Sequence, residues 1–333
     1  MLKKLLIYSI FVVVVIAINL SCEFNNGYNE FKDFAVKDTA SILKFKISDT
    51  ENNIVEISRD NTDKKWLITG TTFEASKPSV ELLMETFYRI RVKQDVPNSA
   101  FNTVINRLSV KYKKVEIFKD EKKPFKTWYI GSPTQDHLGT YMLLQNGKIK
   151  SSVPFITHKP GMYGSLDVRF FTGVENWRST VIFNYINSKK IHSISVKFKN
   201  DSLNNYKIER IKEKVVVYDN TENEVKDFDT IQIKHYLTHF NNINYNKNMF
   251  FKAQIRDSIL AIVPDYQFEL KDYDNKIIKV NLWKVKDNNS DTGWDKEYGI
   301  ININESNELL RVQYFNWEIL FKPLSYFKKD FTK

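Results

Sequence analysis

The sequence predicts an α+β fold made of two tandem duplicated repeats, each an antiparallel sheet with one or two packed helices. Short segments with alternating apolar and polar residues dominate the chain from residue 42 onward, as in half-buried strands. Three segments, at 78–91, about 99–108 and 230–243, instead have apolar residues three and four positions apart, as on one face of a helix. The apolar positions of the helix at 230–243 repeat those of the helix at 78–91 at a constant offset of 153: Val80, Leu83, Phe87 and Ile90 correspond to Ile233, Tyr236, Phe240 and Ile243.

Composition supports a folded, strand-rich chain. Its 333 residues include 24 Phe and 17 Tyr but only 10 Gly and 8 Pro, which suits strands joined by tight polar turns. The formal net charge is +10, and the charged residues are interspersed. We therefore expect good solubility and mild attraction to anionic envelope polymers, and no nucleic-acid partner. With a single cysteine the chain has no intrachain disulfide, so burial alone must stabilise its cores.

The N-terminus predicts export and anchoring. Lys3 and Lys4 precede an apolar run at residues 5–20, and Ser21 stands just before Cys22. We interpret residues 1–21 as a signal peptide and Cys22 as the lipidated residue, because this arrangement resembles a bacterial lipobox, although Asn19 stands where that motif prefers Leu. The alternative is an uncleaved membrane anchor, because the run lies between a signal core of about 7–15 residues and a spanning helix of about 20.

Both interpretations place the remaining chain outside the cytoplasm, facing the periplasm. The membrane is then a partner through the anchor, while inner or outer membrane stays open.

The first repeat is expected at residues 38–188, after a polar tether at 22–37. A helix is predicted at 78–91, with Ser76 before it and Pro78 in its first turn, and a shorter one at about 99–108. The dipeptide Asn146-Gly147 predicts a hairpin. Strands are expected at 42–47, 54–59, 65–69, 113–118, 125–131, 140–145 and 149–156.

The second repeat is expected at residues 189–333. Its helix is predicted at 230–243, and residues 286–295 form a longer loop. Phe268 and Leu270 lie at the same offset of 153 from Val115 and Ile117, which extends the correspondence to a strand. Further strands are expected at 193–198, 206–210, 215–218, 279–285, 299–303 and 309–315.

Several short motifs resemble a known family. They are Trp66-Leu67-Ile68, Pro78 at the helix start, Gly131-Ser132, Gly139-Thr140-Tyr141-Met142, Pro154-Phe155, Pro160-Gly161, Gly164, Arg169-Phe170 and Trp177-Arg178. Together they resemble the domain-of-unknown-function family 4340 of bacterial envelope proteins, often encoded beside gliding-type ABC-transporter genes. The resemblance covers roughly residues 34–198, and the second half of the chain shows it only weakly. It implies an envelope location and a transporter- or complex-associated role, and it brings no established activity.

The turn-rich stretch 158–178 is the candidate partner-binding site, with Tyr163, Arg169, Trp177 and Arg178 as its contact residues. Arg and aromatic residues dominate interface energies. We expect Arg169 and Tyr163 at the surface of a stiff loop that Phe170 and Phe171 anchor to the core. The structural alternative has Trp177 filling a core notch and Arg178 pairing with a carboxylate.

Metal and catalytic chemistry find little support in the sequence. His235 and His239 share a helix face, but no third ligand is evident nearby. The acidic turns that begin at Asp272 and Asp287 lack the Gly and closing Glu of a calcium loop. No nucleophile elbow or phosphate-binding glycine loop occurs. We therefore expect no metal site, no cofactor and no catalytic residue.

The sequence therefore predicts a non-enzymatic, membrane-anchored envelope lipoprotein that binds or scaffolds another envelope protein. One alternative is a glycan or peptidoglycan binder, suggested by the abundance of Tyr and Trp. The other is a hydrolase that uses Asp167 or His158. Oligomeric state is left open.

Overall fold

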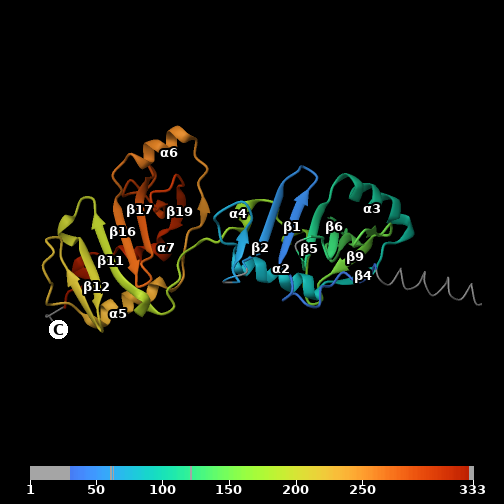
Figure 1. Ribbon diagram of the computed structural model, residues 1–333. Coiled ribbons are helices and arrows are strands. Elements are labelled where there is room, and N and C mark those ends of the chain that lie inside the picture. The colour runs from blue at the N-terminus through green and yellow to red at the C-terminus, as the bar shows by residue number, and fades with distance from the viewer. Residues whose placement is uncertain (1–30, 61, 63, 121, 330–333) are drawn as a thin grey trace, which may run out of the picture. The chain divides into compact units, whose positions relative to one another are not determined.

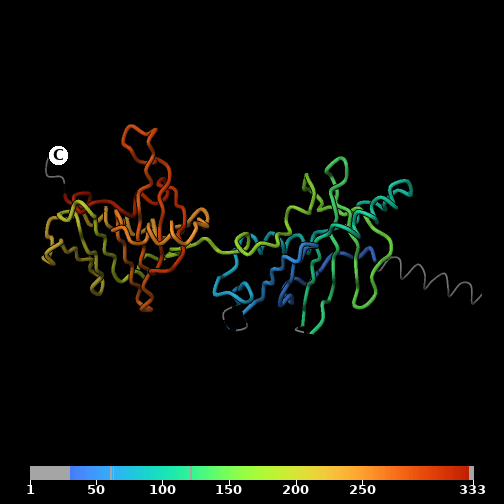
Figure 2. The backbone as a smooth tube through the Cα atoms, turned by 90° about the horizontal axis from the view of Figure 1, so that it is seen from above, coloured from blue at the N-terminus to red at the C-terminus, as the bar shows by residue number. Residues whose placement is uncertain are grey.

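The computed structural model describes residues 31–60, 62, 64–120 and 122–329. The chain divides into two compact units, one ending at Ser179 and the other beginning at Thr180 (Figure 1). Both are α+β with antiparallel sheets, which confirms the predicted class. The division lies before the expected boundary at 188/189, because β10 (Val181–Phe183) pairs with β14 (Ile243–Asn244) of the second unit. Figure 2 traces the single passage of the backbone between the units.

The first unit is built on a nine-stranded sheet in the order β3-β2-β1-β5-β6-β7-β9-β4, with β8 paired to β7. Its strands are β1 (Lys44–Asp49), β2 (Ile54–Arg59), β3 (Trp66–Ile68), β4 (Arg91–Asp95), β5 (Lys113–Phe118), β6 (Lys126–Pro133), β7 (Thr140–Asn146), β8 (Ile149–Lys150) and β9 (Phe155–His158). The hairpin predicted near Asn146 is present, and Asn146 pairs with Ile149.

Two helices cover opposite faces of this sheet. Helix α2 (Lys77–Arg89) begins after the Ser76 cap, and its Val80, Leu83 and Phe87 enter the main core. Helix α3 (Asn98–Val110) instead packs Val104 and Leu108 against alternate residues of β7 and β9 on the other face. The short helix α4 (Val174–Trp177) closes the unit.

The second unit has an eight-stranded sheet in the order β13-β12-β11-β16-β17-β18-β19-β15. Its strands are β11 (Ile191–Phe198), β12 (Tyr206–Ile211), β13 (Lys214–Tyr218), β15 (Lys247–Asn248), β16 (Tyr266–Asp272), β17 (Ile277–Lys286), β18 (Trp294–Ile303) and β19 (Leu310–Gln313). Its helices are α5 (Thr230–Thr238), α6 (Ala253–Leu260) and α7 (Tyr314–Trp317).

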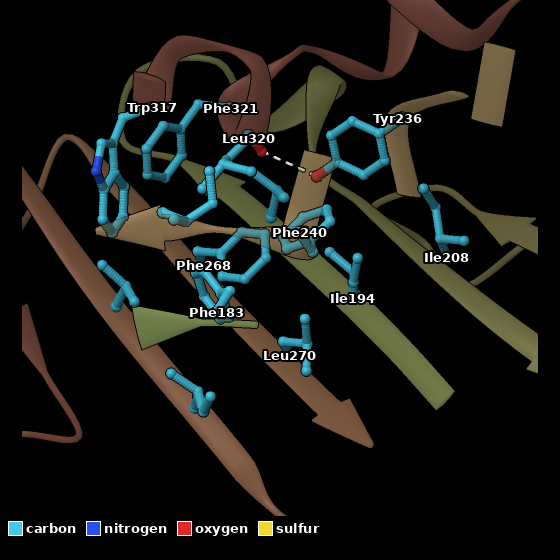
Figure 3. Packing of buried hydrophobic residues seen from close by; sticks show 14 of the residues in the cluster. Phe183, Ile194, Ile208, Tyr236, Phe240, Phe268, Leu270, Trp317, Leu320 and Phe321 are labelled. Atoms are coloured by element: carbon cyan, nitrogen blue, oxygen red, sulfur yellow. Dashed lines mark hydrogen bonds between the residues drawn. The ribbon is translucent and has the colours of Figure 1, made fainter. Parts of the chain in front are cut away.

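The core of the second unit is rich in aromatic side chains (Figure 3). Phe240 stacks on Phe268 of β16 with ring centroids 5.6 Å apart, and Phe183 meets both rings edge-on. The hydroxyl of Tyr236 donates to the carbonyl oxygen of Leu320 at 2.9 Å, so its buried polar atom is satisfied. Trp317 fills the same core with its side chain fully buried.

The helix predicted at 230–243 is shorter than expected. It ends at Thr238, a 3-10 turn follows at His239–Asn241, and Ile243 already belongs to β14. The apolar spacing of the sequence continues to Ile243 because that residue is also buried, but as part of strand β14 and not of the helix. In the first unit, Arg91, the last residue of the helix predicted at 78–91, likewise belongs to a strand, β4 (Arg91–Asp95).

The tether expected at residues 22–37 includes residues that belong to the folded first unit. Phe34 and Val36 are each only 1 % exposed and belong to the core of the first unit. The amide of Val36 donates to the carbonyl oxygen of Phe87, 2.8 Å away. The folded unit therefore begins before residue 38, because these apolar side chains complete the face that α2 covers.

Candidate functional site: the loop after strand β9

The loop after β9 is fixed by backbone turns and by contacts with α2 and β7. Gly161 and Gly164 have φ values of +79° and +104°, the left-handed region that glycine tolerates. The guanidinium of Arg89 donates to the carbonyl oxygen of Pro160 at 3.2 Å. The amide of Leu166 donates to the hydroxyl of the buried Thr140 at 2.7 Å. The loop therefore has attachments on both sides of Tyr163.

A charged cluster joins this loop to α2. The carboxylate of Glu85 accepts hydrogen bonds from Lys159, at 2.7 Å, and from Arg89, at 3.1 Å. The hydrogen bond from Lys159 is the largest cause that holds the pKa of Glu85 below its ordinary value; burial opposes it, and the weaker effect of the Arg89 hydrogen bond adds to the lowering. Arg169 adds a third cation whose charge interacts with Glu85. Three cations around one carboxylate leave positive charge at the base of the loop.

Arg169 is more enclosed than the sequence predicts. Its guanidinium donates to the hydroxyl of Thr86 at 2.9 Å and contacts the sulfur of Met162 at 3.0 Å. The side chain is half-buried, and burial lowers its pKa. Arg169 therefore links the loop to α2 as well as standing near the surface.

Tyr163 lies at the surface, with a side chain 92 % exposed. Phe170 is fully buried and touches Trp128, whereas Phe171 is 40 % exposed. Phe170 therefore anchors the segment as expected, and Phe171 contributes apolar surface along with Val168, which is 59 % exposed.

Trp177 does not lie at the surface, so its assignment as a contact residue is corrected. Its side chain is 1 % exposed and meets Phe45 edge-on, with ring centroids 5.4 Å apart. Its indole N–H donates to the carbonyl oxygen of Phe171 at 2.9 Å. The structural alternative describes this residue: the indole fills the core, where a large apolar ring is most stable.

The Arg178 side chain is also largely enclosed, only 9 % exposed. Its guanidinium lies 3.6 Å from the ring centre of Phe73, and 3.6 Å from the carboxylate of Glu175. The carboxylate pairing of the structural alternative is thus present, and a partner has little access to this side chain.

The other candidate ligands lie in ordinary local contacts. The rings of His235 and His239 meet edge-on, and the Nδ1 atom of His239 lies 3.0 Å from the carbonyl oxygen of His235. Asp272 accepts from the amide of Lys276 at 2.9 Å in a hairpin turn, and Asp287 accepts from the amide of Asn289 at 2.9 Å. Within the described residues, no group of three or more His, Cys, Asp or Glu side chains could hold a metal ion.

The two residues of the hydrolase alternative occupy different settings. His158 ends β9 and pairs with Arg91, and burial followed by the charge of Lys93 lowers its pKa. The carbonyl oxygen of Asp167 accepts from Lys113 at 3.0 Å. In the part of the chain that the structure describes, no hydrogen bond or ion pair joins His158 to Asp167.

Cys22 and the signal segment lie outside the described residues. In the described ranges, no helix has the length and apolar character needed to cross a membrane.

Sequence reasoning overlooked the α2 half of the charged cluster. Glu85 and Arg89 are four residues apart, so they lie side by side on a helix. This spacing in the sequence predicts their ion pair. Thr86 carried no such signal, because its role depends on Arg169, 83 positions away.

Comparison of the chain with known proteins finds no matching family model, no matching curated protein and no matching solved structure. The resemblance to the domain-of-unknown-function family 4340 therefore stays a prediction.

Proposed function

We propose that the protein is a non-enzymatic, membrane-anchored lipoprotein of the cell envelope, and that the loop around Tyr163 binds another envelope protein. One observation carries this proposal. An aromatic side chain that is 92 % exposed stands on a loop attached to the folded unit on both sides. Such a residue loses little entropy on binding, so it suits an interface anchor better than a purely structural role.

The charge around Glu85 indicates the kind of partner surface. Lys159, Arg89 and Arg169 exceed the single carboxylate among them. An acidic segment beside an apolar contact would meet both this positive charge and Tyr163. The family resemblance suggests that the partner belongs to a transporter-associated envelope complex.

We also infer that the two units arose by duplication. Both sheets follow one pattern: three strands in a meander, a helix, a strand at the opposite edge of the sheet, a second helix, and a return beside the first strand. Phe45 is opposed by Ile57 and Ile117, and Ile194 is opposed by Ile208 and Leu270. All of these side chains are buried. Equivalent buried positions in equivalent strands support a common ancestor for the units.

The anchor is proposed at Cys22 and is tested directly. Replacing Cys22 with Ala should abolish labelling of the chain by a radioactive fatty acid, because no other cysteine is present to carry the lipid. Label that persists in the Cys22→Ala chain would reject lipidation at this residue. A wild-type chain that is neither cleaved nor labelled would favour the uncleaved anchor.

Partner binding is tested with two variants of the same loop. Tyr163→Ala removes an exposed ring, so we expect an unchanged melting temperature and at least a tenfold loss of partner recovery from solubilised envelopes. Arg169→Ala should weaken recovery too, but it should also lower stability by about 1–2 kcal/mol through its lost bond to Thr86. Full recovery with Tyr163→Ala would reject the loop as the binding site.

A further inference from the structure

The outer face of the second sheet, opposite α5, is hollowed. A depression of about 470 Å³ opens over β11, β12 and β13, bounded by the turn that follows Tyr218. Ser195, Lys197 and Lys207 face this depression from the strands, since their neighbours Ile194, Val196 and Ile208 are buried on the opposite face. Its volume falls within the range of ligand sites in proteins.

A second depression continues the first across the sheet. It measures about 180 Å³, shares Ser195 and Lys197 with the first, and extends to Gln267 on β16 and Asn281 on β17. The five strands β13, β12, β11, β16 and β17 are neighbours in that order. At about 4.8 Å per strand, the groove crosses roughly 19 Å of sheet. Its shape fits an extended oligomeric ligand.

The side chains of the groove indicate the chemistry of that ligand. Two ion pairs lie within the groove: Lys207 lies 2.8 Å from Glu209, and Lys279 lies 3.6 Å from Glu305. The other charged side chains that line it are one lysine and three acids, Lys197, Asp219, Glu222 and Glu269. The excess of carboxylates in the groove disfavours an anionic ligand, whereas a neutral ligand meets no such repulsion.

Four amide side chains, Asn205, Asn220, Gln267 and Asn281, line the same groove. Each amide can donate and accept hydrogen bonds together, which matches hydroxyl and acetamido groups. Tyr218 adds one aromatic ring at the end of the groove, where the apolar face of a sugar can rest.

We infer that this groove is a binding site for a neutral, N-acetylated glycan chain. The inference does not rest on the abundance of aromatic residues, because most of the Trp side chains, including Trp128 and Trp317, are buried in the cores. It is also independent of the partner-binding loop, which belongs to the first unit.

The test titrates the full-length chain, in detergent, with the neutral tetramer of N-acetylglucosamine. Wild type should show saturable binding. Tyr218→Ala and Asn281→Ala should each weaken it at least tenfold, since both side chains line the groove. Tyr163→Ala is the matched control and should bind as wild type does. Melting curves of each variant show that the fold is intact.

Two outcomes would overturn the inference. The first is no saturable binding of the tetramer at millimolar concentration, including the case in which an acidic peptide binds instead. The second is binding that neither Tyr218→Ala nor Asn281→Ala changes. Partner recovery depends on Tyr163 and tetramer binding on Tyr218. Failure of the glycan-binding inference therefore does not affect the proposed partner-binding loop, and the reverse also holds.

Discussion

The ammonium group of Lys126 lies 2.8 Å from the carbonyl oxygen of Ala35, 91 positions earlier in the chain. It also donates to the backbone carbonyl of Asp33 and lies 3.0 Å from that residue's carboxylate. The lysine side chain is only 6 % exposed. Burial lowers its pKa, and the hydrogen bond and charge of Asp33 oppose that effect. Lys126 therefore holds the entering chain against the first unit.

This attachment is tested by Lys126→Met, which keeps an unbranched side chain and removes the donor. The carbonyl groups that Lys126 satisfies would lose their partner, so we expect a loss of about 1–3 kcal/mol in the free energy of unfolding. Lys123→Met, at an exposed turn position, should change stability by less than about 0.5 kcal/mol. Denaturant titration measures the free energy of unfolding of both variants. Equal values for the two would show that Lys126 does not hold the entering chain.

Phe87 of α2 and Phe240 of the 3-10 turn after α5 should have equivalent effects. Phe87 and Phe240 are both fully buried against their sheets. Truncating either one to Ala should reduce stability by about 3–5 kcal/mol, because each leaves a cavity. Phe315→Ala, with a ring 90 % exposed, serves as the control and should be nearly neutral. A loss below about 1 kcal/mol at Phe87 or Phe240 would mean that the ring is not a core residue.

Much of the regular structure could be predicted because its signals are local. The Ser76 cap, Pro78 and the spacing of Val80, Leu83 and Phe87 identify α2 without knowledge of any other element. Strand β4 was missed because four of its five residues are exposed, which leaves no alternation to detect. Helix α6 has no buried residue, so its sequence shows no clear apolar face directed at a core.

The parts of the site that sequence reasoning misplaced depend on distant contacts. The segment containing Phe34 looked like a polar tether because its partner, Lys126, comes from a strand far along the chain. Trp177 looked like a contact residue because it follows a glycine-rich stretch, yet Phe45 of β1 encloses it. Tyr163 was placed correctly at the surface, since two glycines fix turns on either side of it.

Acid should loosen the loop through Glu85. Its pKa in the folded protein is below the ordinary 4.5, so its contribution to stability is present above pH 4.5 and is lost as the pH falls through the folded value. At neutral pH, Glu85→Gln should lower stability by about 0.5–1 kcal/mol, because both of its ion pairs are partly exposed.

Thermal melts of wild type and Glu85→Gln between pH 6 and pH 3 measure this difference, which should shrink as the pH falls. Glu81→Gln provides the control on the same helix, since its pair with Lys77 is long, at 3.8 Å, and exposed. A difference between wild type and Glu85→Gln that persists unchanged at pH 3 would show that charge on Glu85 is not the cause.

The central claim is that the loop around Tyr163 contacts another envelope protein, and site-specific photo-crosslinking in intact cells tests it most directly. A photoreactive amino acid replaces Tyr163 in one chain and Phe315 in another, since both side chains are at least 90 % exposed. We predict a discrete crosslinked adduct with an envelope protein from position 163 and none from position 315. No adduct from position 163, or the same adduct from both positions, would contradict the claim.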